Sequence, residues 1–193
     1  MGAPALSRGL LIVLSGPGAV GKDTMIGLLR KRDPRLRYSI SYTTRPRREY
    51  EVDGVHYSFV DESTFRRLIA EGEFLEHASV GGYLYGTSAR RVEEMQDAGD
   101  DVILKIDVQG AEQVRRRRPD GIFIFLAPPS MDELLRRRRE RGTEDREVMA
   151  ARQRLAEVEM SFADRYDYVV VNDDAERAAG EVEEILERCR SSR

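Results

Sequence analysis

The 193-residue sequence has one cysteine, two histidines and no tryptophan. The single cysteine, Cys189, excludes an internal disulfide, and the two histidines do not have the spacing of metal ligands, so we expect no zinc site. No apolar run approaches the length of about 20 residues that a membrane helix needs. The N-terminal residues lack the pattern of a secretory signal, and we therefore expect a cytoplasmic protein without a membrane partner.

Lysine is also scarce, since it occurs only at positions 22, 31 and 105, and the other 29 basic residues are arginines. The formal net charge is −3, which gives no reason to expect a nucleic-acid partner. The arginine run at 115–118 is typical of the solvated end of a helix. With 40% hydrophobic and 35% charged residues, the composition indicates a globular protein with one α/β core and small inserts.

A glycine-rich segment follows the apolar run 10–14 and precedes a helical pattern that extends to residue 32. This order is typical of a phosphate-binding loop, because the N–H groups of the turn and the positive end of the helix dipole both attract an anion. Lys22 can reach the outer phosphates of a triphosphate, whereas the alternative interpretation is a tight turn without a ligand. The predicted triphosphate-binding residues, here called the phosphate loop, are Gly16, Pro17, Gly18, Ala19, Val20, Gly21, Lys22, Asp23 and Thr24.

One position of this loop departs from the motif G-x-x-x-x-G-K-[ST], in which a hydroxyl ligand for Mg²⁺ follows the lysine. Here Asp23 follows Lys22, and Thr24 comes one residue later. A carboxylate oxygen is a suitable ligand for Mg²⁺, directly or through a water molecule. Asp23 therefore either contacts the metal through its water shell or serves as an acid that stabilises the first turn of the helix.

Predicted strands and helices alternate along the chain. The predicted strands cover 10–14, 38–42, 101–106, 121–126 and 168–171. The predicted helices cover 22–32, 89–98, 111–117, 131–140, 147–159 and 175–190. Strands that are joined through helices indicate a parallel sheet covered on both faces, with ligands at the carboxyl ends of the strands, where the phosphate loop also lies.

The region between residues 43 and 89 has a different texture, with short alternating stretches rich in glycine, tyrosine and charge. Arginines and tyrosine hydroxyls can bind a phosphate, and a carboxylate can accept hydrogen bonds from the N–H groups of a base. This combination favours a second, phosphorylated ligand. His56 is expected at the surface of this region, and His77 near the site without acting in it.

Five motifs in order resemble those of the guanylate kinase family, over nearly the whole chain. They are Ser41–Arg48 (S-x-T-T-R-x-x-R), Tyr85–Thr87 (Y-G-T), Ile106–Gly110 (I-D-x-Q-G), Arg141–Glu144 and Asn172–Asp174. The resemblance implies that ATP and GMP, with Mg²⁺, give ADP and GDP. It also implies a P-loop NTPase core with a parallel β-sheet flanked by helices (1–40, 89–130 and 155–193), a small GMP-binding insert (41–88) and a helical lid (131–154).

The resemblance also implies roles for particular residues. Arg45, Arg48, Tyr57 and Tyr85 would hold the phosphate of GMP, and Ser41, Glu76, Thr87 and Asp107 would recognise guanine. Arg137 would lie near the adenine of ATP, while Arg141 and Arg152 would reach the transferred phosphates. These three arginines, with Lys22 and Arg45, would form the catalytic set. The neighbouring Arg136, Arg138 and Arg139 are interpreted as a solvated face of the lid helix.

Two other functions are possible on the residues alone. The Lys22–Asp23–Thr24 variant of the loop also resembles ribose bisphosphate kinases, but Glu76 and Thr87 argue against that substrate. A non-catalytic module related to guanylate kinases could use the GMP region to bind peptides, yet Lys22 and the lid arginines are present here. Protein partners are not indicated by any feature of the sequence.

Overall fold

The computed structural model describes residues 8–141 and 146–192, without the side chains of 141 and 146–150. The chain divides into two compact units. The first contains the chain up to Ile12, Arg35–Leu104 and Gln109–Gly121, and the second contains Val13–Pro34, Lys105–Val108 and the chain from Ile122 onward. The predicted division into core, insert and lid stays a prediction.

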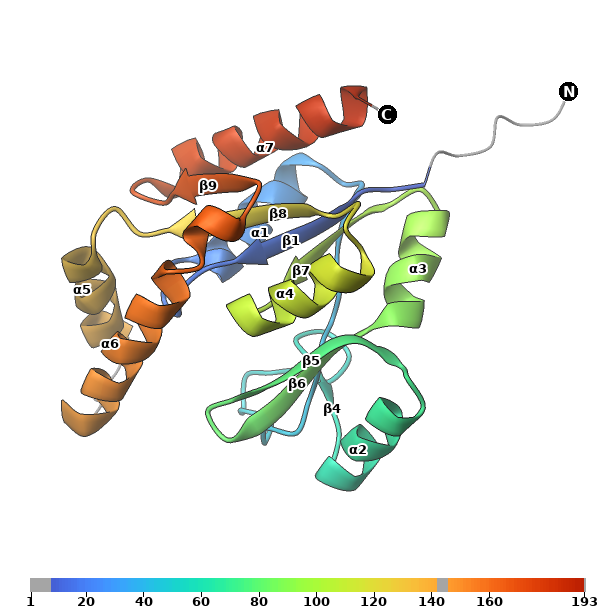
Figure 1. Ribbon diagram of the computed structural model, residues 1–193, viewed down its shortest axis with the longest axis horizontal. Helices are drawn as coiled ribbons and strands as arrows, with labels where there is room; N and C mark the ends of the chain where they lie inside the picture. Colours follow the sequence, from blue (N-terminus) through green and yellow to red (C-terminus); the bar gives the residue numbers. More distant parts are fainter. Residues whose placement is uncertain (1–7, 142–145, 193) are drawn as a thin grey trace, which may run out of the picture. The chain divides into compact units, whose positions relative to one another are not determined.

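In the second unit, the chain forms the phosphate loop between a buried strand and a helix. The elements of this part are β1 (Leu11–Ser15, of which Leu11 and Ile12 are assigned to the first unit), α1 (Lys22–Arg32), β8 (Ile122–Ala127), α5 (Met131–Arg141), α6 (Arg146–Met160), the short 3₁₀ helix η1 (Ala163–Arg165), β9 (Tyr168–Val171) and α7 (Ala175–Ser191). All residues of β1 and β8 are buried, as expected for strands covered on both faces. Helix α7 lies beside β9 and packs on α1 (Figure 1).

The first unit contains the shorter strands and the helices between them. Its elements are β2 (Leu36–Tyr38), β3 (Tyr42–Thr43), β4 (Ser58–Phe59), α2 (Glu62–Ala70), β5 (Phe74–Val80), β6 (Tyr83–Ser88), α3 (Ala89–Asp97), β7 (Asp101–Lys105) and α4 (Val108–Arg117). Strands β5 and β6 form a hairpin across Gly81 and Gly82, which both have positive φ angles.

The strands form two sheets, and the larger one has the order β2-β7-β1-β8-β9. Strand β2 pairs in parallel with β7, and β8 pairs in parallel with β9. Neighbours that are not consecutive in the chain are connected through helices, so the prediction of a parallel sheet flanked by helices is confirmed. The smaller sheet has the order β4-β3-β6-β5.

Two expectations about the first unit need correction. The prediction of one strand at 38–42 is wrong. Strand β2 ends at Tyr38 in the larger sheet, and β3 begins at Tyr42 in the smaller one. The chain leaves β2 after Tyr38, where the Ser39 N–H still donates to the carbonyl of Ile103 at 3.1 Å. Helix α2 was not predicted; the Asp61 side chain caps it by accepting from the Thr64 N–H, and Phe65 is its buried anchor.

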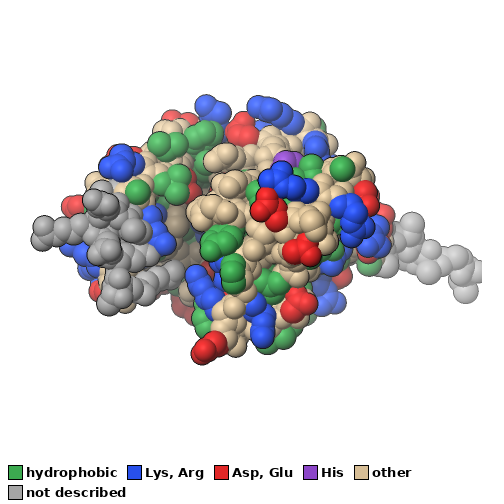
Figure 2. Space-filling view, turned by 90° about the horizontal axis from the view of Figure 1, so that it is seen from below, with side chains coloured by type: hydrophobic (Ala, Val, Ile, Leu, Met, Phe, Trp, Pro, Cys, Tyr) green, Lys and Arg blue, Asp and Glu red, His purple; other side chains and the backbone are tan. Residues whose placement is uncertain are grey.

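The helices that cover the sheet have one apolar side. In α7, Ala178, Val182, Ile185 and Leu186 are buried, which is the spacing of a single helix face. None of the helices in the described part of the chain is long and apolar enough to span a bilayer. Lys and Arg side chains lie among Asp and Glu side chains on the face drawn in Figure 2.

Candidate functional site

The backbone of the phosphate loop has the conformation that its glycines allow. Gly16 and Gly21 have φ angles of 138° and 106°, and Gly21 is the N-cap of α1. A Cβ atom at Gly16 would lie 2.2 Å from the carbonyl oxygen of Leu126, so a side chain cannot be accommodated there. Ala19, between them, is the one non-glycine residue with positive φ (70°) in the described ranges. Such strain in a non-glycine residue is typical of functional turns.

Lys22 folds back over the loop from the first turn of α1. Its Nζ atom donates to the carbonyl oxygens of Gly16 at 2.5 Å and Pro17 at 3.2 Å. Burial lowers the pKa of Lys22 to about 8, and Lys105 acts in the same direction. Glu159, Asp23 and Asp107 oppose this shift because their negative charges favour the ammonium form. The lysine is therefore fixed at the loop and mostly charged at neutral pH.

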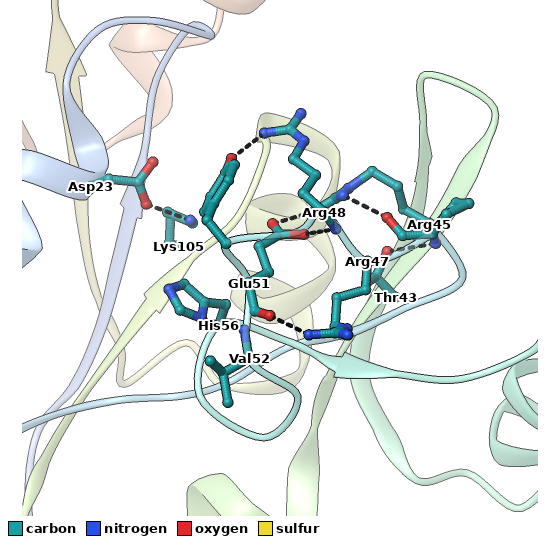
Figure 3. Close-up of polar contacts among 11 residues, drawn as sticks. Asp23, Thr43, Arg45, Arg47, Arg48, Glu51, Val52, His56 and Lys105 are labelled. Carbon is teal, nitrogen blue, oxygen red and sulfur yellow. Dashed lines mark hydrogen bonds and ion pairs between the residues drawn. The ribbon is translucent and has the colours of Figure 1, made fainter.

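The Asp23 side chain, 79% exposed, forms an ion pair with Lys105, whose Nζ lies 2.5 Å from Oδ1 (Figure 3). The pair neutralises the carboxylate that would otherwise repel a phosphate. Within the described residues there is no group of three or more His, Cys, Asp or Glu side chains that could hold a metal. The arrangement fits Mg²⁺ of the nucleotide-bound kind, in which one carboxylate contributes and phosphates and water supply the other ligands.

Three residues distant in sequence also hold the loop, and none was selected from the sequence as a site residue. The buried Asn172 amide donates from Nδ2 to the Val20 carbonyl at 2.7 Å. The buried Glu159 accepts from the Gly18 N–H at 3.4 Å, and burial raises its pKa. Arg138 donates from Nε and Nη2 to the Gly18 carbonyl at 3.1 and 3.0 Å.

For Arg138, the interpretation as part of a solvated face is wrong, because this residue is only 7% exposed. Its neighbours behave as predicted: Arg136 pairs with Glu133 and Glu140 at the surface, and the exposed Arg139 bonds the carbonyl of Leu135 in its own helix. A run of consecutive arginines does not reveal which of them faces the protein interior. The helical spacing from the buried Leu134 would have been the usable signal, since 134 and 138 lie on one face.

The predicted lid arginines lie on α5 and α6. The Arg137 Nε atom donates to Glu133 at 2.7 Å, and its side chain is 21% exposed. Arg152 is exposed, and its carbonyl accepts from Arg138 Nη1 at 2.5 Å. The Arg141 side chain and Gly142–Glu144 lie outside the described residues. The roles of these arginines toward ATP stay predictions.

In the first unit, the register of the small sheet places the predicted guanine and phosphate residues. Thr43 in β3 pairs with Tyr85 in β6, and Glu76 in β5 pairs with Thr87 in β6. Tyr85 and Thr87 lie on the same face of β6 because side chains alternate along a strand. A register shift between Phe74 and Glu76 interrupts the regular pairing just before Glu76, as bulges near functional sites do.

Glu76 and Thr87 are both buried, with 3% and 1% exposure. The Thr87 hydroxyl donates to Glu76 Oε1 at 2.6 Å, so the hydroxyl proton is directed at the carboxylate. Ser41, which precedes β3, is buried as well. A buried carboxylate with one oxygen bonded to a hydroxyl can accept further hydrogen bonds from a base with adjacent N–H groups.

Arg45 is the centre of the predicted phosphate residues. Its Nη2 atom donates to Glu51 Oε1 at 2.6 Å (Figure 3), and its Cζ lies 5.6 Å from the centroid of the Tyr57 ring. The Tyr57 and Tyr85 rings meet edge to face with centroids 5.9 Å apart. Hydrogen bonding to Glu51, and secondarily to Tyr85, raises the pKa of Arg45 above its usual value. The structure thus brings Arg45, Tyr57 and Tyr85 together.

Glu51 is a further residue of this cluster that was not predicted. It is 4% exposed, and its Oε2 atom accepts from the backbone N–H of Arg48 at 2.8 Å. The pKa of Glu51 is lowered, chiefly by Arg45. The predicted Arg48 side chain is exposed and donates to the Tyr50 hydroxyl at 2.7 Å. The sequence does not single out Glu51, because Glu49 and Asp53 stand two residues before and after it.

Asp107 and the histidines complete the predicted set. Asp107 belongs to the second unit and lies within electrostatic range of Lys22 and Glu159. His56 is exposed, as expected, and its Nδ1 atom accepts from the Val52 N–H at 2.9 Å (Figure 3). His77 is partly buried, and its backbone bonds the Gln113 side chain.

Comparison with known proteins gives a consistent result. The family model described as guanylate kinase matches residues 8–189. The chain is 46% identical to a guanylate kinase of Carboxydothermus hydrogenoformans, over 94% of this chain and 89% of that protein. It is 48% identical to one of Halalkalibacterium halodurans, over 96% and 92%. The crystal structure of guanylate kinase from Anaplasma phagocytophilum has a TM-score of 0.78 and 37% identity, covering 94% of this chain and 86% of that one. A shikimate kinase from Bacteroides thetaiotaomicron, at 16% identity and a TM-score of 0.51, shares the fold.

Proposed function

Because the chain belongs to the guanylate kinase family, we propose that it transfers the γ-phosphoryl group of ATP to GMP and releases ADP and GDP. The observation that carries the choice of acceptor is the buried Glu76–Thr87 pair, in the same small sheet as Tyr85, whose ring meets that of Tyr57 beside Arg45. One end of such a site accepts N–H groups and the other binds an anion. A guanine nucleotide with one phosphate has both features.

In this proposal, Glu76 accepts hydrogen bonds from the ring N–H and the exocyclic amine of guanine, and Ser41 donates to its carbonyl oxygen. Thr87, whose hydroxyl donates to Glu76 in the free protein, would have to turn that proton toward the base to contact the same carbonyl oxygen. Adenine lacks that pair of adjacent donors, so the Glu76 carboxylate would gain no hydrogen bonds from the base that covers it. Loss of hydrogen bonds to a buried charged acceptor costs roughly 1–3 kcal/mol, which favours GMP over AMP. Asp107 is proposed as a second acceptor for guanine, on the basis of the family motif alone.

Phosphoryl transfer needs no covalent nucleophile from the protein. An anionic phosphate oxygen of GMP attacks the γ-phosphorus in line, a new P–O bond forms, and the bond to the β-phosphate oxygen breaks with its electrons on ADP. Arg45, Arg48, Tyr57 and Tyr85 orient the attacking phosphate. Loop N–H groups and Lys22 stabilise the negative charge on the transferred group, with Arg141 and Arg152 proposed as further donors and Arg137 as the adenine contact.

Mg²⁺ belongs to the proposal as the ion bound with ATP, where it would neutralise phosphate charge. Asp23, together with nucleotide oxygens and water, would hold it. If Asp23 contributes to this site, Asp23→Ser raises the Mg²⁺ concentration needed for half-maximal activity. An unchanged Mg²⁺ dependence would leave Asp23 only its ion pair with Lys105. We also propose that the protein acts in the cytoplasm.

The test of the proposed function is a coupled assay of ADP release with GMP, AMP, dGMP and ribose bisphosphate as acceptors. We expect turnover with GMP and at least a 100-fold lower kcat/KM with AMP. Equal turnover of GMP and AMP, or activity with ribose bisphosphate alone, would contradict the proposal. The absence of turnover with every acceptor, combined with peptide binding, would favour the non-catalytic alternative.

A further inference from the structure

Arg138 is a buried cation that the proposed mechanism does not use. It lies on α5, and two of its nitrogen atoms donate to the same acceptor, the Gly18 carbonyl, at 3.1 and 3.0 Å. A third, Nη1, donates to the Arg152 carbonyl of α6 at 2.5 Å. Burying an arginine is unfavourable unless its donors are satisfied. Here backbone oxygens satisfy them, and one of these oxygens belongs to the phosphate loop.

The bond to Gly18 fixes the orientation of the following peptide. The described residues contain no cis peptide bond, so the Gly18 carbonyl and the Ala19 N–H point in opposite directions. With the carbonyl held by Arg138, the Ala19 N–H faces away from the guanidinium. Ala19 is also the non-glycine residue with a positive φ, a conformation that needs support from its surroundings.

The other flank of Gly18 is held from α6. Glu159 accepts the Gly18 N–H at 3.4 Å, and the positive charge of Arg138 favours the ionised form of this carboxylate. The guanidinium lies so close that a Cβ atom at Gly18 would be 3.3 Å from Arg138 Nη2. Residues of two helices thus fix the backbone of the loop on both sides of Gly18.

We propose that Arg138 is a positioning residue for ATP, which turns the Gly18–Ala19 peptide so that the Ala19 N–H is offered to the bound phosphates. The guanidinium itself stays on the carbonyl side of this peptide and does not contact the nucleotide. The inference rests on the proposed use of the loop for ATP, and it makes ATP affinity depend on α5.

The experiment compares Arg138→Met with Arg139→Met, an exposed arginine next in the same helix that bonds only the Leu135 carbonyl among the contacts described for it. Calorimetry with MgATP in the absence of acceptor measures the Kd. We expect Arg138→Met to raise the Kd of ATP by about 10- to 100-fold, as for loss of charge-assisted bonds. Arg139→Met and the Kd of GMP in both variants should stay within about twofold.

Arg138→Lys separates positioning from simple packing. A lysine can donate one bond to the Gly18 carbonyl but not the paired bonds of a guanidinium. We expect it to recover part of the ATP affinity that Arg138→Met loses. Thermal unfolding and GMP binding show whether each variant is folded. If Arg138→Met does not fold, the ATP affinity of Arg138→Lys relative to wild type decides.

An unchanged Kd of ATP in folded Arg138→Met would overturn the inference. So would an equal loss of ATP and GMP affinity, which would indicate general damage to the fold. The binding experiment needs no turnover, so it can fail while GMP is still phosphorylated. Conversely, wild-type protein that binds ATP but ignores GMP would contradict the proposed function and leave the Arg138 comparison intact.

Discussion

Lys22 in the phosphate loop and Arg45 in the insert are both cations placed for a phosphate, yet different kinds of partner hold them. The Lys22 ammonium is held by two loop carbonyls, and the loop itself is fixed by Asn172, Glu159 and Arg138 from distant parts of the chain. Arg45 is held by Glu51, six residues along the chain. The phosphate loop is therefore held by tertiary contacts, whereas the segment from Arg45 to Glu51 is held by a local ion pair.

The two cations also differ in their response to pH. Burial lowers the pKa of Lys22 to about 8, whereas the carboxylate of Glu51 raises the pKa of Arg45 further from neutrality. Of the two cations, only Lys22 can lose its positive charge within the pH range in which enzymes ordinarily work. Mutations and pH should consequently separate the ATP half of the reaction from the GMP half.

The largest difference between the effects on ATP and on GMP is expected for Lys22→Met. Removal of this charge leaves the transferred phosphoryl group without a main cationic contact, and kcat/KM for ATP should fall by about 10³-fold. The Kd of GMP, measured by calorimetry without ATP, should stay within about twofold of wild type. Lys31→Met, which removes an unrelated lysine of the same helix, is the control. A comparable loss of GMP affinity in Lys22→Met would show that the two half-sites are not independent.

The opposite result, weaker GMP binding with little change for ATP, is expected for Glu76→Gln. An amide presents donors where guanine needs acceptors, so KM for GMP should rise by about 10- to 100-fold, corresponding to roughly 1–3 kcal/mol. KM for ATP should change little, and the preference for GMP over AMP should shrink. Glu71→Gln, at the exposed end of α2, provides the control. If the GMP/AMP preference survives in Glu76→Gln, guanine is recognised elsewhere.

A stability difference should follow from the tertiary support of the loop. Asn172→Ala leaves the buried Val20 carbonyl without its 2.7 Å partner, and the free energy of unfolding should decrease by about 2 kcal/mol. Urea denaturation measures this change. Asp173→Ala, at the neighbouring exposed position, should lower stability by less than about 1 kcal/mol because it removes only exposed contacts, an ion pair with Arg177 and a hydrogen bond from the Asp174 N–H. Equal effects of the two substitutions would contradict the proposed support.

The pH dependence is the effect that is smallest near neutral pH. The ammonium form of Lys22 binds phosphate, and its pKa in the free protein is about 8, so kcat/KM for ATP should be constant below pH 8 and fall about tenfold per unit above it. Of the charged groups that act on Lys22, Glu159, Asp23 and Asp107 raise its pKa and Lys105 lowers it. Glu159→Gln should therefore move the decline to lower pH. A pH-independent kcat/KM between pH 7 and 9.5 would exclude this titration.

Much of the fold was predictable because local patterns were strong. The buried strands β1, β7 and β8 contain continuous apolar runs, and the loop glycines follow β1 directly. Strand β9 is also apolar in sequence, although only Val170 of its residues is buried. The prediction of one strand at 38–42 was wrong because the alternation of apolar and polar residues does not show that the chain passes from one sheet to the other within five residues. Helix α2 is an element whose local signal went unused, since Phe65, Leu68 and Ile69 have the spacing of a helix face after the N-cap Asp61.

The sequence by itself determined the phosphate loop, the parallel α/β sheet and the family, because strand, glycine turn and lysine are adjacent in the chain and the family motifs are contiguous. Only the tertiary structure decided that Arg138 is buried on the Gly18 carbonyl and that Asp23 pairs with Lys105. Each of these depends on which side of a helix or turn meets a partner elsewhere. A run of similar charges does not encode that choice, since burial of one arginine is set by the acceptors that the fold brings to it.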